Sequence, residues 1–252
     1  MMQYITITIP SYGLMAVIGL IVSICYLYYR LMVCKNELEL SMRDFGSLCI
    51  LSALGCLIGS RLLFFITMIP SLCEEFSLSK AVNYLLFGGF VFYGGLIGAY
   101  CGTALFSKIK KHKTIEMFNY VTPAFVLFHI FGRIGCLMAG CCYGFKLNND
   151  LIIGGIHIHY FPIQAIEALF EAIMFILLSK TKMKNNPFKW YILCYASYRF
   201  IEEFFRGDTE RGFLFWLSTS QWVSLFLLIF TVSYLNLKSK KGVLKNEFAI
   251  KE

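Results

Sequence analysis

The sequence predicts an all-α polytopic membrane protein of about seven transmembrane helices, with its N-terminus outside and its C-terminus inside. Hydrophobic residues fill 58% of the 252 positions and charged residues 15%, whereas soluble domains average about 45–50% and about 25%. The mean hydropathy is +0.67. Apolar runs of roughly 20 residues, long enough to cross a bilayer, alternate with short charged segments. An ordinary soluble domain is therefore excluded.

Seven apolar runs follow one another with short connections. They cover approximately residues 12–32, 45–68, 82–106, 118–139, 162–180, 190–205 and 214–235. We expect one transmembrane bundle over residues 1–237, followed by a basic cytoplasmic tail at 238–252. The third run has five glycines between positions 88 and 98, which predict close helix contact or a broken helix.

The positive charges predict the orientation. Of the 23 Lys and Arg residues, sixteen lie in segments 30–43, 108–113, 180–189 and the tail, all on one predicted side. Because cytoplasmic segments carry an excess of Lys and Arg, this side is inside. Topology thus accounts for the net charge of +8, and no nucleic-acid partner is expected. On this topology, the outward-facing helix ends are those that carry Tyr12, the Cys141–Cys142 pair and Arg206.

Several charged side chains lie within or at the ends of the apolar runs. Arg61, Arg133 and Arg199 lie inside them, and Arg206 lies at a run's end. A charge at the bilayer centre costs about 2.5–3.5 kcal/mol on insertion scales, so each needs a partner or a wet cavity. Arg199 can pair with Glu203 at i,i+4, whereas Arg61 and Arg133 need something else. Either interhelical ion pairs fix the bundle, or the guanidinium forks hold a lipid phosphate.

Three of the ten cysteines cluster in residues 129–144, namely Cys136, Cys141 and Cys142. Their spacing differs from the C-x2-C pairs of structural zinc sites, so neither a metal nor another cofactor is predicted. Two interpretations stay open. Cys136 forms a disulfide with Cys141 or Cys142 on the oxidising outer face, or Arg133 lowers the pKa of a reactive thiol.

Several motifs resemble the bacterial prolipoprotein diacylglyceryl transferases, in family order over nearly the whole chain. They are Tyr12-Gly-Leu-Met15, Gly59-Ser-Arg61, the glycine-rich segment 88–98, Gly132-Arg133-Ile-Gly135, Pro162-x-Gln164-x-x-Glu167, Arg199-x-x-x-Glu203-x-x-Arg206 and Ser218-x-x-Gln221. Each motif alone is weak, but seven in order indicate a shared fold.

The resemblance implies an enzyme of the bacterial cytoplasmic membrane, multi-pass, with its active site toward the outer leaflet. Such enzymes transfer the diacylglyceryl group of phosphatidylglycerol to the lipobox cysteine of a prolipoprotein, forming a thioether and releasing glycerol phosphate. The resemblance makes Arg133 and Arg199 the phosphate-holding residues, with Glu203 orienting Arg199 and Tyr93 also catalytic. The residues implied to bind substrate are Tyr12, Arg61, Gly94, Gly95, Gly98, Gly135, Gln164, Glu167, Arg206 and Gln221.

The sequence departs from the family pattern at two places. Tyr93-Gly-Gly stands where the family has His-Gly-Gly, and Cys136, Ala139 and Cys141 replace Asn, Asn and Glu of the signature. Tyrosine, with a pKa of about 10, is a poorer base than histidine. Because these family positions are changed, the sequence leaves two acceptors open: the lipobox cysteine of a prolipoprotein, or another thiol. Two alternatives remain: a membrane enzyme that depends on Cys141 or Cys142, and a non-catalytic bundle that binds or transports phospholipid.

Overall fold

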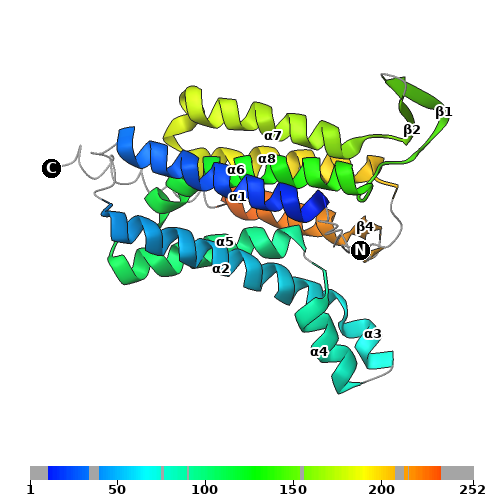
Figure 1. Ribbon diagram of the computed structural model, residues 1–252, viewed down its shortest axis with the longest axis horizontal. Helices are drawn as coiled ribbons and strands as arrows, with labels where there is room; N and C mark the ends of the chain where they lie inside the picture. Colours follow the sequence, from blue (N-terminus) through cyan, green and yellow to red (C-terminus); the bar gives the residue numbers. More distant parts are fainter. Residues whose placement is uncertain are drawn as a thin grey trace, which may run out of the picture. The chain divides into compact units, whose positions relative to one another are not determined.

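The structure is a computed structural model that describes residues 11–33, 40–74, 77–89, 91–153, 156–207, 213–214 and 216–233 (Figure 1). The chain divides into two compact units. Unit 1 comprises Met1–Val22 and Phe125–Glu252, and unit 2 comprises Ser23–Ala124. A single bundle over residues 1–237 stays a prediction, and the tail at 238–252 lies outside the described residues.

The described chain is mostly helical. Its helices are α1 (Ser11–Val33), α2 (Met42–Thr67), α3 (Ile69–Glu74), α4 (Leu78–Phe87), α5 (Phe92–Lys110), α6 (Thr114–Ala139), α7 (Ile163–Lys180), α8 (Pro187–Glu202) and a last helix, Thr219–Ser233, with short 3-10 helices η1 (Lys182–Asn185) and η2 (Glu203–Phe205). In length and apolar composition, α1, α2 and α6 suffice to cross a membrane. A helical membrane protein fits these findings, while the number of seven helices and the orientation stay predictions.

In unit 2, the third apolar run is broken, as its glycines suggested. Helix α4 ends at Phe87 and α5 begins at Phe92. Gly88 lies in this break, and the Arg61 guanidinium donates a hydrogen bond to its carbonyl oxygen. Carbonyls at a helix end lack partners within the helix, so Arg61 satisfies one of them. Substrate binding by Arg61 stays a prediction.

Helices α2 and α5 contact each other through glycines, which confirms the expected close approach. A Cβ atom on Gly55 or Gly59 would overlap the backbone of α5, and one on Gly94 or Gly98 would overlap the backbone of α2. Beside Gly95, a Cβ would lie 3.2 Å from the sulfur of Cys56. Small residues allow this packing between membrane helices. The three predicted glycines of α5 therefore have a packing role, and their role in substrate binding stays a prediction.

Polar contacts join the helix ends at one end of unit 2. The Lys110 ammonium lies 2.7 Å from the Asp44 carboxylate, which links the end of α5 to the start of α2. The Tyr120 hydroxyl donates to the Leu27 carbonyl at 2.7 Å, and Arg30 donates to the Tyr120 carbonyl at 2.8 Å. Arg30 and Lys110, one from each of two basic segments, thus lie at the same end of the unit.

A β-hairpin in unit 1 was not predicted. Strand β1 (Lys146–Ile153) pairs antiparallel with β2 (Ile156–Tyr160), and a second, minimal pair joins β3 (Phe213–Leu214) to β4 (Leu217–Ser218). The first hairpin leaves the end of α6 and returns to α7 (Figure 1). Its base is fixed to η2, which follows α8, because the Phe145 N–H donates to the Phe205 carbonyl at 3.1 Å.

We predict that Gly59→Ala lowers the melting temperature of the detergent-solubilised protein, since the added methyl group overlaps the α5 backbone. Gly46→Ala, in the same helix but with open space around it, is the matched control. Alanine is about 1 kcal/mol better than glycine inside a helix, so the control should melt at the same or a higher temperature. Equal melting temperatures for the two variants would contradict the glycine packing.

Candidate active site

Three helices of unit 1 place polar side chains at helical spacing. Helix α6 carries His129, Arg133 and Cys136, which lie on one face because they are four and three residues apart. Facing positions on the other two helices are Gln164, Glu167 and Glu171 of α7 and Tyr191, Tyr195, Arg199 and Glu202 of α8. All of these except the half-buried Cys136 are buried. An apolar helix bundle thus encloses a polar interior.

Glu167 is the centre of this interior. Its side chain has 0% exposure. One carboxylate oxygen lies 2.7 Å from Nε of Arg133 and 3.9 Å from a terminal nitrogen of Arg199. The other accepts a hydrogen bond from the Tyr195 hydroxyl at 3.1 Å. One carboxylate on α7 therefore holds guanidinium groups from two other helices.

Of the two interpretations left open for Arg133, an interhelical ion pair or a bound lipid phosphate, the structure shows the ion pair. Glu167 lies on a different helix, so spacing within one helix did not reveal the pairing. The expected contact between Arg199 and Glu203 is present at 3.1 Å, and Glu202 contacts Arg199 as well. Glu202 was not predicted as a site residue, although its i,i+3 spacing is a usable signal. The catalytic roles themselves stay predictions.

The network extends further into unit 1 through His129, which sequence reasoning did not assign to the site. Its Nδ1 lies 2.9 Å from Glu171, and its Nε2 lies 3.5 Å from Glu167. The Tyr191 hydroxyl donates to Glu171 at 3.4 Å. His129 precedes Arg133 by one helical turn, and that spacing was the available signal.

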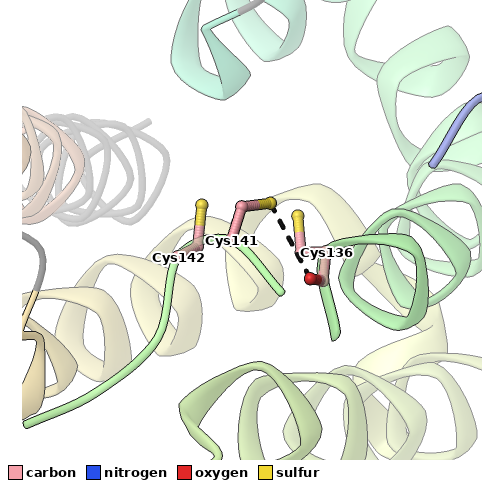
Figure 2. Close-up of side chains that lie close together, drawn as sticks. All are labelled: Cys136, Cys141 and Cys142. Carbon is pink, nitrogen blue, oxygen red and sulfur yellow. Dashed lines mark hydrogen bonds between the residues drawn. The ribbon is translucent and has the colours of Figure 1, made fainter. Parts of the chain in front are cut away.

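The three clustered cysteines come together where α6 ends (Figure 2). Their sulfur atoms all lie within 4.8 Å of one another, and all three are free thiols. The chain turns back at Gly140 and Cys142, both with left-handed backbone at φ 67° and 59°. Gln164 of α7 holds the turn, because its amide nitrogen donates to the Cys141 carbonyl at 2.6 Å.

The cysteines differ in acidity. A hydrogen bond with Cys136, opposed by burial and supported by the charges of Arg206 and Arg133, lowers the pKa of the Cys142 thiol to about 5. Burial and the neighbouring Cys142 raise the pKa of the Cys141 thiol. The thiolate is the form that attacks carbon or binds metal, and the lowered pKa of Cys142 favours this form. Of the two open interpretations, the free thiols favour the reactive thiolate.

Two other predicted residues of unit 1, Tyr12 and Arg206, lie near the end of α6 where the cysteines cluster. Tyr12 of α1 packs on Gly135, where a Cβ would lie 3.3 Å from the tyrosine ring. Arg206 follows η2, and its backbone bridges to Gly144. Both residues lie near the cysteines. Tyr12 interacts electrostatically with all three of them, and Arg206 interacts with Cys142.

The remaining predicted residues have structural contacts of their own. Gln221 forms a reciprocal cap with Ser218, each side chain accepting the other's backbone N–H at 3.0 and 3.2 Å. This capping box starts the last helix. Tyr93 and the predicted α5 glycines are buried in unit 2, and Arg61, in the same unit, is half-buried. The part that these residues play in binding substrate stays a prediction.

Comparison with known proteins decides the family. The family model described as prolipoprotein diacylglyceryl transferase matches residues 1–237. The chain belongs to this transferase family. A relative from Clostridium tetani is 31% identical over 242 residues, covering 91% of this chain and 93% of the relative. One from Clostridium perfringens is 34% identical over 205 residues, covering 77% and 78%. A third, from Coxiella burnetii, is 31% identical over 235 residues and covers 86% of each chain.

All three relatives are named phosphatidylglycerol–prolipoprotein diacylglyceryl transferases, the Clostridium perfringens protein as number 2. These matches confirm the family that the motifs indicated. Gly132-Arg133-Ile-Gly135, one of the motifs that indicated this family, contributes Arg133 to the ion network that Glu167 centres in unit 1.

We predict that Glu167→Gln strongly destabilises the protein, because it leaves Arg133 and Arg199 buried without their shared carboxylate. Breaking a buried ion pair costs about 3–5 kcal/mol, measurable as a fall in unfolding free energy in detergent. Glu116→Gln is the control, since Glu116 pairs with Lys113 with side chains 45% and 79% exposed, and exposed pairs contribute about 0–1 kcal/mol. Similar effects in both variants would contradict a central role for Glu167.

Proposed function

We propose that this protein transfers the diacylglyceryl group of phosphatidylglycerol to the lipobox cysteine thiol of a prolipoprotein, forming a thioether and releasing glycerol phosphate. Family membership supports this reaction. The observation that carries it is the pair of buried arginines, Arg133 and Arg199, that Glu167 holds from a facing helix. Such a pair presents planar forks of N–H donors, which suit phosphate oxygens.

The leaving group explains why two arginines are useful. When the thiolate attacks the glycerol carbon, the carbon–oxygen bond breaks and its electrons move to the phosphate ester oxygen. Donors fixed at that place stabilise the developing charge. Arg133 meets Glu167 most closely through Nε, and we propose that its terminal amino groups meet the phosphate. Glu203, 3.1 Å from Arg199, orients that second fork.

Arg133 and Arg199 are already paired with carboxylates, which assigns recognition to directed hydrogen bonds. Three arginines stand with three glutamates at this end of unit 1; they are Arg133, Arg199, Arg206, Glu167, Glu202 and Glu203. A phosphate therefore gains from well-placed donors rather than from a net positive pocket. Tyr12 and Gln164 help to position the headgroup.

The remaining assignments are part of the same proposal. Residues 1–237 form one multi-pass bundle in the bacterial cytoplasmic membrane with a basic cytoplasmic tail, and the active site faces the outer leaflet. Three apolar helices of spanning length and the one-sided distribution of Lys and Arg support this topology. Tyr93 is catalytic as a hydrogen-bond donor to phosphate. The other substrate-binding residues are Arg61, Gly94, Gly95, Gly98, Gly135, Glu167, Arg206 and Gln221.

A second candidate is a cysteine-dependent enzyme in which one of the three thiols attacks the lipid itself. The mutual proximity of the sulfur atoms favours it. The two candidates differ in where the lipid goes first. Intact-protein mass spectrometry during turnover separates them, because only the second candidate adds a lipid mass to the protein.

The proposed function is tested by incubating the purified protein with phosphatidylglycerol and a lipobox peptide and measuring the thioether peptide by mass spectrometry. We expect Arg133→Lys to lose roughly 100-fold in rate, the typical effect of removing one fixed donor, because a point charge does not replace the fork. Arg43→Lys, an exposed arginine of α2, is the control and should keep full activity. Absence of thioether with the unaltered protein, or full turnover in Arg133→Lys, would contradict the proposal.

A further inference from the structure

The three cysteine sulfur atoms are already spaced almost as a metal site requires. A tetrahedral zinc ion with Zn–S bonds of about 2.3 Å needs sulfur atoms roughly 3.8 Å apart. The sulfur atoms of Cys136, Cys141 and Cys142 lie within 4.8 Å of one another, so small side-chain rotations suffice. Among the described residues, this cluster contains three sulfur donors and neither a histidine nor a carboxylate.

The backbone that gathers the sulfur atoms is specifically built. Cys142 has left-handed backbone at φ 59°, a conformation that costs a non-glycine residue roughly 1–2 kcal/mol and that is found at ligand clamps. Gln164 holds the Cys141 carbonyl from α7 at 2.6 Å, and the Cys141 N–H donates to the Cys136 carbonyl at 3.1 Å. A turn that served only to end α6 would need neither the strained cysteine nor the contact from a second helix.

The number and charge of the donors favour a soft divalent cation. A disulfide would use two of the thiols and strand the third, whereas all three are free. Thiolate ligands select soft metals such as zinc. Three thiolates with Zn²⁺ carry one negative charge, and a fourth thiolate makes two. Arg206 and Arg133 both interact electrostatically with Cys142, so positive charge lies beside the negatively charged filled site.

One coordination position remains open to a substrate. Catalytic zinc sites have three protein ligands and leave the fourth place to water or substrate, whereas structural sites have four protein ligands. Cys141 is exposed while its two partners are half-buried, so the cluster can be reached from outside. A thiol that coordinates zinc is deprotonated by the metal.

We infer that Cys136, Cys141 and Cys142 bind Zn²⁺ and that its fourth position holds the acceptor thiol as a thiolate. This inference rests on the proposed function. The acceptor R–SH coordinates the zinc and releases its proton to solvent. Its sulfur then attacks the glycerol carbon of phosphatidylglycerol, a C–S bond forms, and the C–O bond breaks with its electron pair on glycerol phosphate. The neutral thioether is a weaker ligand and leaves.

This assignment accounts for two departures from the family pattern. Cysteines stand at two signature positions where the family has Asn and Glu, and Tyr93 stands where it has histidine. If zinc deprotonates the acceptor, a histidine base is not needed. Cys136 follows Arg133 by three residues, which places the two side chains on one face about 5–6 Å apart at Cβ. The acceptor thiol and the donor phosphate thus meet on neighbouring turns of α6.

Metal binding is measured first, on the full-length protein purified under reducing conditions and stripped with a chelator. Titration with Zn²⁺ against a chromophoric chelator should show one tight equivalent. The variants Cys136→Ser, Cys141→Ser and Cys142→Ser should each bind at least about 100-fold more weakly, since even outer-shell changes at zinc sites cost 10–100-fold. Cys194→Ser, a half-buried cysteine of α8, is the matched control. Substoichiometric zinc, or unchanged affinity in the three variants, would overturn the inference.

Acceptor coordination is measured on the Co²⁺-substituted protein, whose thiolate-to-metal absorption depends on the number of bound thiolates. A lipobox peptide should raise this absorption by about one third, as thiolates increase from three to the four of a tetrahedral site. A peptide with serine for cysteine should not change it. An unchanged spectrum with the cysteine peptide would overturn the inference without any requirement for turnover.

The transfer assay then separates this inference from the proposed function. Zinc-free unaltered protein should lose thioether formation and regain it when Zn²⁺ is added. Because this comparison uses no substitution, a folding defect cannot cause the loss. Undiminished transfer by the zinc-free protein would overturn the zinc inference while the proposed function stands. Peptide coordination without any thioether from phosphatidylglycerol would overturn the proposed transfer while the thiol-binding zinc site stands.

Discussion

The carboxylate of Glu167 is the contact on which the polar interior of unit 1 depends. An arginine inside an apolar bundle is tolerated only with a compensating partner, and Glu167 compensates two of them. Removing that carboxylate would leave the cations unpaired in a region of low dielectric constant. The tyrosine and histidine contacts around it fix its position. The arginines are therefore held in place before any substrate arrives, as preorganised catalysis requires.

Helix α6 joins the two halves of the proposed reaction. We propose that Arg133 acts on the departing phosphate, and Cys136, one turn further on, belongs to the sulfur cluster that we infer receives the acceptor thiol. The turn at Gly140 and Cys142 brings the other two sulfur atoms back to that helix end. The base of the β-hairpin and the residue after η2 also meet there, through the bridge between Gly144 and Arg206. In the proposed reaction, this one helix end therefore positions both the lipid donor and the acceptor thiol.

The sequence was sufficient for features that depend on neighbouring residues. Apolar length located the long helices to within a few residues. The glycines of the third run predicted close helix contact or a broken helix, and the structure has both. The hairpin at 146–160 was missed because Ile156-His-Ile-His159 gives only a short alternating pattern between strong helical signals. Glu167 as the partner of Arg133 could not be found, since no spacing rule pairs residues on different helices.

The approach of the three cysteine sulfur atoms could not be predicted from the sequence either. Linear spacing argued against a metal site, because Cys136, Cys141 and Cys142 lack the C-x2-C pattern of structural zinc. Two residues with positive φ fold the chain back and bring the three sulfur atoms together. Backbone conformation of that kind is unexpected at a cysteine, so only the structure reveals it.

The central claim is that Arg133, held by Glu167, recognises the phosphate of the lipid donor. The most direct measurement compares binding of phosphatidylglycerol with binding of diacylglycerol, which lacks the phosphate, to the unaltered protein and to Arg133→Gln in detergent micelles. The account predicts that the unaltered protein prefers phosphatidylglycerol and that Arg133→Gln loses this preference while it binds diacylglycerol as before. An equal preference for phosphatidylglycerol in both proteins would contradict it.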